Sequence, residues 1–277
     1  MPRRPHDDDD YEDDRPRKRR RSRDDDYDER PPAESNTKLI LLIVGGVFGL
    51  FFLVCGGIGF MMYRGLQQGI QQVGASAQNM QQSNNLKQIG LGMHSQSDTN
   101  NGLAAPFTVD KTGTVRPGLS FRVGLLPYME QDALYRRFDM TKAWDAPENK
   151  TLGQVVVPQY TGPNAPQSSD TPFRVFHGGG ALFETDGKLL KLSSVSDGLS
   201  NTIMVVAGTD SVPWSKPQEF PYSKTTPLPK LQVTANGKYL VLMADGSTRY
   251  VSPTISELVL RQAIEKADGN VINWPGE

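Results

Sequence analysis

The longest hydrophobic pattern in the chain is an uninterrupted apolar run from Leu39 to Tyr63, which contains no charged residue. As a helix rising about 1.5 Å per residue, the run would reach about 37 Å, enough to cross a hydrocarbon core of about 30 Å with some tilt. We interpret it as a transmembrane helix that contacts the lipid bilayer. A cleaved secretory signal is the alternative, but its apolar region is usually only about 7–15 residues long.

From Arg64 to about Ser97 the pattern stays helical but becomes polar. Apolar residues recur at spacings of four and three, which places them on one helix face. They are Leu66, Ile70, Val73, Ala77 and Met80, followed after a break at Asn84 by Leu86, Ile89 and Met93. Glycines and glutamines make the first part a weak coiled coil. We therefore predict a helical stalk over residues 64–97 whose distal half packs on a globular domain.

Residues 98–277 are divided by Pro and Gly into short segments. Ser120 is placed to cap a helix that runs to about Leu126, and Pro127 to open a second helix. Short runs rich in β-branched and aromatic residues predict strands at 155–157, 173–176, 181–184, 201–206 and 239–243. Asp245-Gly246, followed by the run 247–251, predicts a β-hairpin with a type I′ turn.

An amphipathic helix is predicted to close the chain over residues 256–267, with Leu258, Leu260, Ile264 and Ala267 as its apolar positions. Short helices and hairpin-connected strands together indicate an α+β fold class with an antiparallel sheet. The predicted architecture is a long N-terminal helix, transmembrane and then stalk, packed on that sheet, with residues 98–277 as an extracytoplasmic α+β domain.

Charge adds detail mainly at the N-terminus. Residues 1–38 hold 11 Lys or Arg against 13 Asp or Glu, and with so few apolar side chains they cannot bury enough surface to offset chain entropy. We predict a disordered tail, which the positive-inside bias places in the cytoplasm, with the larger domain outside. The predicted location is the inner (cytoplasmic) membrane, crossed once. Acidic blocks bracket the basic cluster, so we expect no nucleic-acid partner; contact with lipid or protein is the alternative.

The apolar run also contains the only cysteine, Cys55, which excludes an intramolecular disulfide and a cysteine-based zinc site. Gly45 and Gly49 form a small-xxx-small pair in the same run. Self-association of two helices through this pair is an alternative to simple anchoring.

Several short motifs follow one another from about residue 84 to residue 273. They are NNLKQIGL at 84–91, SFRV at 120–123, LLPYMEQ at 125–131, WDAPENK at 144–150, DGLSNTI at 197–203, VPWSKP at 212–217 and ADGS at 244–247. In this order they resemble the large planctomycete family of unknown function, domain 1559, which is also labelled as carrying a prepilin-type H-x9-DG signature.

This resemblance implies a pilin-like architecture in the cell envelope, with a long helix half in the membrane and half packed against an antiparallel sheet. It implies no established activity. Many relatives carry a leader in which a Gly is followed by Phe-Thr-Leu-Ile-Glu, and that motif does not occur before or within Leu39 to Tyr63. The sequence therefore gives no support for cleavage and polymerisation. Ala235 and Ala207 stand where the family's His and a Glu are expected, so we expect no chemistry from those side chains.

Candidates for ligand binding are weak. Trp144 and Trp214 carry aromatic faces that can line a groove, and His177 precedes three glycines whose amides can cradle an anion. Packing of the tryptophans in a core and a plain turn at the glycines are the simpler interpretations. His94 and Asp98 share a helix face, which suits a carboxylate that orients an imidazole, or simply packing at a helix end.

Two Asp-Gly pairs, Asp197-Gly198 and Asp245-Gly246, most simply form turns, with calcium binding through their carboxylates as the alternative. We expect no catalytic residue, no metal site and no cofactor, because neither a nucleophile elbow nor a dinucleotide fingerprint nor paired metal-ligand histidines occur.

The pattern as a whole predicts a membrane-anchored extracytoplasmic structural or interaction module, with an unidentified envelope protein or ligand as its partner, and not an enzyme. One alternative is a membrane-anchored ligand-binding protein, which requires a deep apolar pocket around Trp144 or Trp214. Another is a pseudopilin-like subunit of a secretion or envelope assembly. An envelope-side enzyme would require convergent polar groups with perturbed pKa values.

Overall fold

The computed structural model describes residues 36–110, 112–162, 165, 167–186, 188–270, 272 and 274. The predicted disordered tail, residues 1–38, lies almost entirely outside the described residues. The chain divides into two compact units, Met1–Met61 and Met62–Glu277, and each is considered by itself. In the first unit the described residues from Thr37 onwards belong to α1 (Thr37–Asn100), which continues into the second unit.

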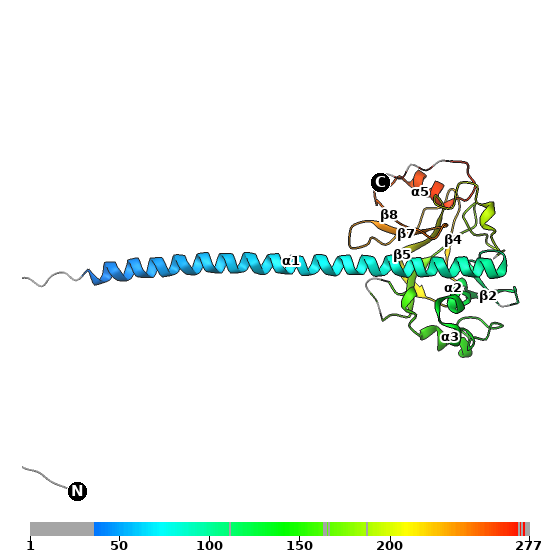
Figure 1. Cartoon of the computed structure of the whole chain (residues 1–277), viewed down its shortest axis with the longest axis horizontal. Coiled ribbons are helices and arrows are strands. Elements are labelled where there is room, and N and C mark those ends of the chain that lie inside the picture. The colour runs from blue at the N-terminus through cyan, green and yellow to red at the C-terminus, as the bar shows by residue number, and fades with distance from the viewer. Residues whose placement is uncertain are drawn as a thin grey trace, which may run out of the picture. The chain divides into compact units, whose positions relative to one another are not determined.

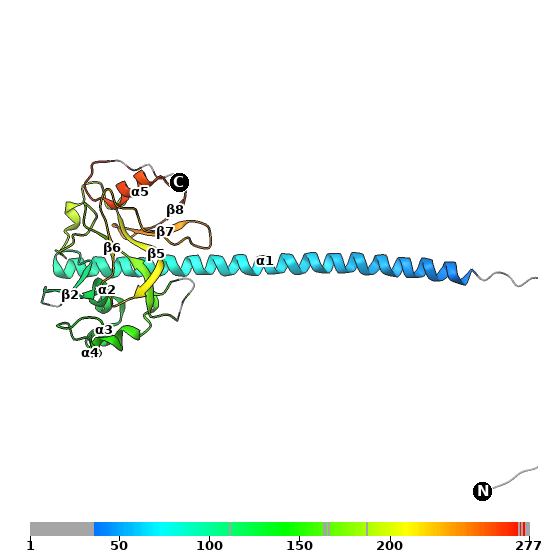
Figure 2. The ribbon, with the colours of Figure 1, turned by 180° about the vertical axis from the view of Figure 1, so that it is seen from behind.

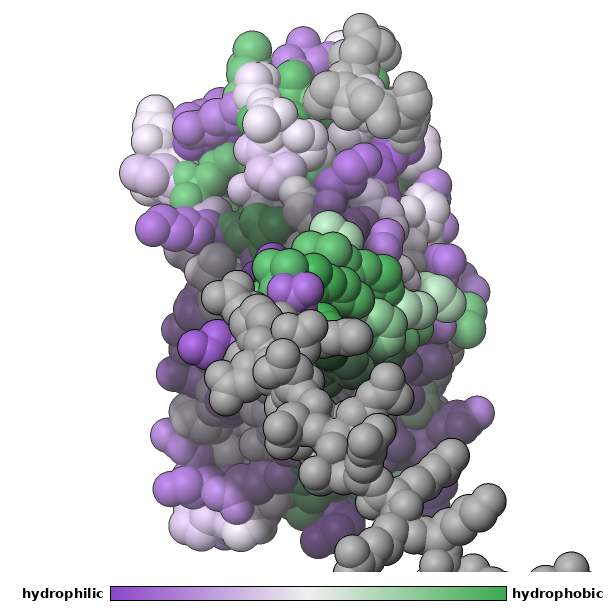
Figure 3. All heavy atoms as spheres, turned by 90° about the vertical axis from the view of Figure 1, so that its left-hand side faces the viewer, coloured by the Kyte–Doolittle hydropathy of each residue, from purple (hydrophilic) through white to green (hydrophobic). Residues whose placement is uncertain are grey.

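The first unit contributes an apolar helix whose large hydrophobic side chains are exposed from Leu39 onwards. Among the described residues, α1 is the helix that is long and apolar enough to cross a membrane, judged by length and composition. In Figure 3 the exposed hydrophobic side chains form one dense green group, while much of the other described surface is hydrophilic. The sequence therefore contains a candidate membrane-spanning helix.

Within the second unit, the C-terminal part of α1 is the spine of the main hydrophobic core. Leu86, Ile89 and Met93 are buried there, whereas the earlier stripe from Leu66 to Met80 is exposed. Gly90 allows the closest approach to the sheet, because a Cβ at this position would lie 3.0 Å from a methyl group of Leu242. The predicted long helix packed on an antiparallel sheet is thereby confirmed.

The sheet has four antiparallel strands in the order β3 (Asp170–Arg174), β5 (Ile203–Pro213), β7 (Tyr239–Met243) and β8 (Thr248–Val251). Successive residues of β7 alternate between two hydrophobic clusters, as the period of a strand requires. Leu240 and Leu242 join the cluster of α1, and Val241 and Met243 join that of α5 (Glu257–Ile264). The sheet therefore lies between α1 and α5, as Figures 1 and 2 show from opposite sides.

The hairpin at Asp245-Gly246 is present, but its predicted turn type is wrong. Met243 and Ser247 close a three-residue loop, in which the Gly246 N–H donates to the Met243 carbonyl at 3.0 Å. Gly246 takes a positive φ of 85°, whereas Asp245 does not have one. A type I′ turn needs positive φ at both central residues, so this is the three-residue loop that ends in a left-handed glycine.

Other predicted boundaries also shift. The helix expected after Pro127 consists of two short pieces, η1 (Leu126–Met129) and α3 (Asp132–Tyr135), because Glu130 turns the chain with a φ of 62°. No strand forms at 155–157, which follows η2 (Leu152–Gln154), and 181–184 makes only isolated bridges. Leu258 of α5 is 66% exposed and is not part of the apolar face.

The remaining elements are short and connect these layers. They are β1 (Phe107–Val109), β2 (Val115–Ser120), α2 (Phe121–Leu125), α4 (Pro147–Lys150), η3 (Pro158–Tyr160), β4 (Phe176–His177), η4 (Leu192–Ser194) and β6 (Phe220–Pro221). β1 pairs with β2 antiparallel, and β4 pairs with β6 in parallel.

Candidate functional site

Arg122 is the most highly connected polar side chain of the second unit. Ser120 caps α2, with its hydroxyl accepting the Arg122 N–H, and this places the Arg122 side chain inside the molecule at 0% exposure. Its guanidinium donates to three backbone carbonyls, those of Trp214 (2.8 Å), Phe173 (2.8 Å) and Lys216 (3.1 Å). The SFRV and VPWSKP motifs are therefore joined by one side chain.

Glu219 neutralises that buried cation. Arg122 Nη2 lies 2.8 Å from Glu219 Oε1, and Nη1 donates to Oε2 at 3.2 Å. The same carboxylate accepts the Val175 N–H at 3.1 Å. Burial raises the pKa of Glu219, and the Arg122 guanidinium and the Val175 N–H oppose that rise. With its charge paired and its donors used, the pair acts as an internal clamp rather than as a reactive centre.

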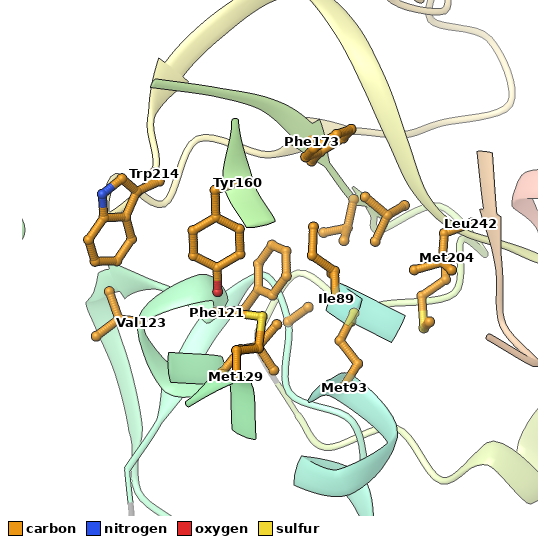
Figure 4. Close-up of a cluster of buried hydrophobic side chains, with 14 of the residues drawn as sticks. Ile89, Met93, Phe121, Val123, Met129, Tyr160, Phe173, Met204, Trp214 and Leu242 are labelled. Atoms are coloured by element: carbon orange, nitrogen blue, oxygen red, sulfur yellow. The ribbon is translucent and has the colours of Figure 1, made fainter. Parts of the chain in front are cut away.

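Trp214 belongs to the core, as Figure 4 shows. It is fully buried, its Nε1 donates to the Val155 carbonyl at 2.9 Å, and its ring centroid lies 5.7 Å from those of Phe138 and Tyr160. The Tyr160 hydroxyl donates to the Arg122 carbonyl at 2.6 Å, and burial raises its pKa. Trp214 therefore offers no ring face to a ligand in this structure.

Trp144, by contrast, is half-buried and lines a cavity of about 220 Å³ together with Lys150, Asp170 and Ser215. The Lys216 ammonium lies 5.3 Å from its ring centroid, within the range of a cation–π contact. The cavity is smaller than the roughly 300–1,000 Å³ typical of ligand pockets. In the part of the chain that the structure describes, this cavity is thus smaller than the deep apolar pocket that the ligand-binding alternative requires around Trp144 or Trp214.

Asn149 of the WDAPENK motif holds the loop that precedes the motif. This buried amide accepts the Asp139 N–H at 2.9 Å and donates to the carbonyls of Asp139 (2.9 Å), Lys142 (3.2 Å) and Ala143 (3.1 Å). One side chain thereby holds a loop that lacks regular hydrogen bonding of its own. The motif therefore has a structural role here. It is recognisable in the sequence, but its asparagine was not predicted to hold a loop.

His177 lies at the start of a tight glycine turn. It is half-buried, its Nδ1 has no hydrogen-bond partner in the described part of the chain, and burial lowers its pKa. Gly178, Gly179 and Gly180 all have positive φ, and a Cβ on Gly179 would collide with the Tyr222 carbonyl. The Gly178 N–H already donates to Phe183, and the Glu265 carboxylate lies beside Gly180. An anion would meet an occupied amide and a negative charge there, so the turn is a poor anion cradle.

The two Asp-Gly turns lie side by side, and their carboxylates accept hydrogen bonds from backbone N–H groups. The Asp197 carboxylate accepts the N–H groups of Asp268 (2.6 Å) and Gly269 (3.0 Å), and that of Asp245 accepts the Ser247 N–H (2.8 Å). The Asp245 N–H donates to the Leu199 carbonyl at 3.1 Å, which links the turns. Over the described ranges, no group of three or more His, Cys, Asp or Glu comes together as a metal site.

His94 lies beneath the second of these turns. A Cβ on Gly246 would be 3.6 Å from the His94 ring, and His94 Nε2 is buried with no hydrogen-bond partner among the described residues. The imidazole is thus in ordinary van der Waals contact with the turn, and no hydrogen bond joins it to Asp98 in the described structure. This placement favours packing for His94.

Tyr128 marks a groove that sequence reasoning missed. Its side chain lines two cavities, one of about 260 Å³ on the side of Gln96 and Tyr135 and one of about 300 Å³ on the side of Gln88 and Leu91. We call these two cavities together the Tyr128 groove. Its walls include residues of α1 and of η1, so the NNLKQIGL and LLPYMEQ motifs meet at it, and β1, α2, α3 and η3 contribute further lining residues. The sequence signal was weak, because Tyr128 is a single aromatic residue within the LLPYMEQ motif.

Gln96 places a buried amide at this groove. Its side chain is 1% exposed, Nε2 donates to the Gly124 carbonyl at 3.1 Å, and Oε1 has no partner in the described structure. An acceptor buried without a donor is costly, by roughly 1–3 kcal/mol. A bound group that donates a hydrogen bond to Gln96 Oε1 would remove that cost.

Asp110 supplies the negative charge at the same groove. Burial would raise its pKa, but hydrogen bonds from Thr112, Arg116 and the Thr114 N–H outweigh this effect and lower it from 3.8 to about 2. The Arg116 guanidinium lies 2.6 Å from Asp110 Oδ2. The carboxylate is therefore ionised at neutral pH and already paired.

The fold and these contacts together define an α+β protein with a candidate membrane-spanning helix. Most of the sequence motifs of this protein supply side chains that hold the interior together. Residues 71–226 match the family described as Protein of unknown function (DUF1559), which is more than half of the chain. The chain belongs to this family. Comparison with curated proteins and with solved structures gives no match.

Proposed function

We propose that this is a single-pass protein of the cell envelope, anchored in the inner membrane by Leu39 to Tyr63. In this proposal the charged tail lies in the cytoplasm, and the second unit lies outside as a pilin-like structural or interaction module. The apolar, exposed first part of α1 and the basic flank before Leu39 support the anchor and its orientation. The family's planctomycete members suggest that a planctomycete is the source.

The Tyr128 groove is the observation that carries the interaction role. The other motifs are directed inward: Arg122 binds three carbonyls, Asn149 holds a loop, and Trp214 is buried. Tyr128 and Leu91 instead line open cavities, and Leu91 is 67% exposed. Tyrosine is among the residues enriched in the small set that carries most of the binding energy of a protein contact. We expect a segment of an envelope protein to insert an apolar side chain beside Tyr128.

A binding role accounts for these contacts better than catalysis. The carbonyls of Phe173 and Lys216 hold the buried guanidinium of Arg122, which lies 2.8 Å from Glu219 Oε1, although this oxygen accepts no hydrogen bond in the described structure. The acidic group at the groove, Asp110, is held ionised by hydrogen bonds from Thr112, Thr114 and Arg116, which makes it a poor proton donor. We therefore expect the domain to recognise a partner and not to transform one.

Photo-crosslinking in intact cells tests this role. A benzophenone amino acid replaces Tyr128 in one variant and Leu258 in the other; Leu258 is exposed to 66% on α5, away from the groove. We expect a discrete adduct with an envelope component from position 128 and only background from position 258. Equal adduct patterns at both positions would contradict a specific role for the groove.

A ligand-binding role is the second candidate, and the unpartnered Gln96 Oε1 favours it. A cavity of about 260 Å³ admits only a small molecule with a hydrogen-bond donor. In that case Gln96→Leu would abolish the thermal stabilisation given by the ligand, because the acceptor is lost while the volume is nearly kept. A variant that keeps full ligand-induced stabilisation would exclude Gln96 from the site.

A further inference from the structure

The exposed apolar face of α1 just before the globular part has the spacing of a coiled coil. Six positions follow one another in steps of three and four: Tyr63, Leu66, Ile70, Val73, Ala77 and Met80. All of them are exposed, and the four large aliphatic side chains among them are each more than 60% exposed. We call these six residues the seam.

Alternating steps of three and four are informative because they average about 3.5 residues, the repeat that keeps one face of a helix against a second helix. A stripe that serves only to cover a globular core would be buried by it. Here the described part of the second unit leaves the seam without cover. The pattern therefore indicates a helical partner that is not part of the same chain.

The globular part packs on the opposite face of the helix. With 3.6 residues per turn, the buried residues Leu86, Ile89 and Met93 lie roughly 180–240° around the axis from Met80, whereas exposed Leu91 lies about 20° from it. In Figure 1 the C-terminal part of α1 lies in front of the sheet, while in the view from behind β5 crosses in front of it. Ala77 and Leu91 line cavities beside Thr161 and Tyr128, so the globular part borders the line of the seam but leaves these two residues exposed.

The charge pattern favours an identical partner. From Gly65 to Leu86 the chain has no charged residue, and the positions beside the seam are Gln, Gly, Ser, Ala and Asn. Two copies in parallel would therefore bring no like charges together at the flanking positions that usually set partner choice. A charged partner helix would find no complementary side chain there.

We propose that two copies of this chain associate through the seam as a short parallel coiled coil. The inference rests on the proposed membrane anchor, which orients both helices alike, sets their register and raises their effective concentration. That help is needed because the seam spans only about 26 Å and is interrupted by Gly65, Gly69 and Gly74, which weaken a helix. The contact begins at Tyr63, the last residue of the membrane run, and continues beyond the run, so it differs from an association through Gly45 and Gly49.

Disulfide crosslinking of the full chain tests the seam. Cys55→Ala removes the only cysteine, and a single cysteine is then placed by Val73→Cys in the seam or by Gln71→Cys, which is also exposed but points about 200° away. Both variants are reconstituted at the same low protein-to-lipid ratio and oxidised. We expect a covalent dimer from Val73→Cys, none above background from Gln71→Cys, and loss of the dimer when Ile70→Lys is added to Val73→Cys.

The substituted side chains are exposed, so the fold of the second unit is preserved in each variant. Equal crosslinking at positions 71 and 73 would overturn the seam, because it would report random collision. The seam would also be overturned if the chain resisted alkaline extraction from the vesicles but formed no dimer. In that case the proposed membrane anchor would still hold. A chain that alkaline extraction releases would overturn both the anchor and the seam.

Discussion

Arg122→Leu removes the side chain that connects α2 to β3 and to the loop before β6. The substitution deletes the hydrogen bonds to the carbonyls of Phe173, Trp214 and Lys216, and it leaves the Glu219 carboxylate buried without its cation. Leucine fills part of the volume but donates nothing. Because the guanidinium opposes the effect of burial on Glu219, its loss also raises the pKa of that carboxyl further.

The expected loss of stability is large. Removing one partner of a buried ion pair typically lowers the free energy of unfolding by about 3–5 kcal/mol, and the three unpaired carbonyls add to that. A domain is usually stable by only about 5–15 kcal/mol, so the variant would lie near the limit of folding. The double variant Arg122→Leu, Glu219→Leu should recover part of the loss, since it removes the uncompensated charge.

Urea unfolding followed by tryptophan fluorescence measures this loss. All three tryptophans lie in the second unit, so the signal reports its unfolding while detergent holds the apolar helix. Arg136→Leu is the control, because Arg136 forms an ion pair with Asp132 while 72% exposed, and such pairs contribute little. A loss for Arg122→Leu no larger than that of the control would refute the clamp.

Three further outcomes follow from the same contacts. The pKa of Asp110 is lowered from 3.8 to about 2. Its ionised form therefore stabilises the fold above pH 4, and that contribution is lost as pH falls toward 2. The stability of Asp110→Asn should accordingly fall less steeply over this pH range than that of the parent chain. Gly179→Ala should lower the melting temperature far more than Gly237→Ala. Both glycines have positive φ, but only a Cβ on Gly179 meets the Tyr222 carbonyl. Equal shifts in melting temperature would disprove the collision. Asn149→Ala should lower the free energy of unfolding by about 1–3 kcal/mol and speed hydrogen exchange over residues 139–143, and unchanged exchange there would show that the loop does not depend on this amide.

The parts of the fold that follow from local pattern were predictable. The apolar run, the helix after it, the cap at Ser120 and the β7–β8 hairpin all depend on residues close in sequence. The turn type was wrong because Asp-Gly suits both a two-residue loop and a three-residue loop, and only strand register decides between them. Leu258 was misplaced because a short helix has too few turns to define its buried face.

The site depends on contacts that no local pattern reveals. The partners of the Arg122 guanidinium lie 51, 92, 94 and 97 residues away, and a single arginine in a short motif does not indicate a buried clamp. Trp214 is equally compatible with a groove and with a core until Phe138 and Tyr160 are placed against it. The Tyr128 groove arises where α1 and η1 meet, and neither element defines a cavity alone.

The account's central claim is that Leu39 to Tyr63 anchors the second unit on the outer side of the inner membrane. In a Cys55→Ala background, Ser22→Cys marks the tail and Thr225→Cys marks an exposed position of the second unit. A membrane-impermeant maleimide is applied to intact spheroplasts and to lysed ones. We expect labelling at position 225 in both and at position 22 only after lysis. Labelling at position 22 in intact spheroplasts, or protection of position 225 until lysis, would contradict the proposed topology.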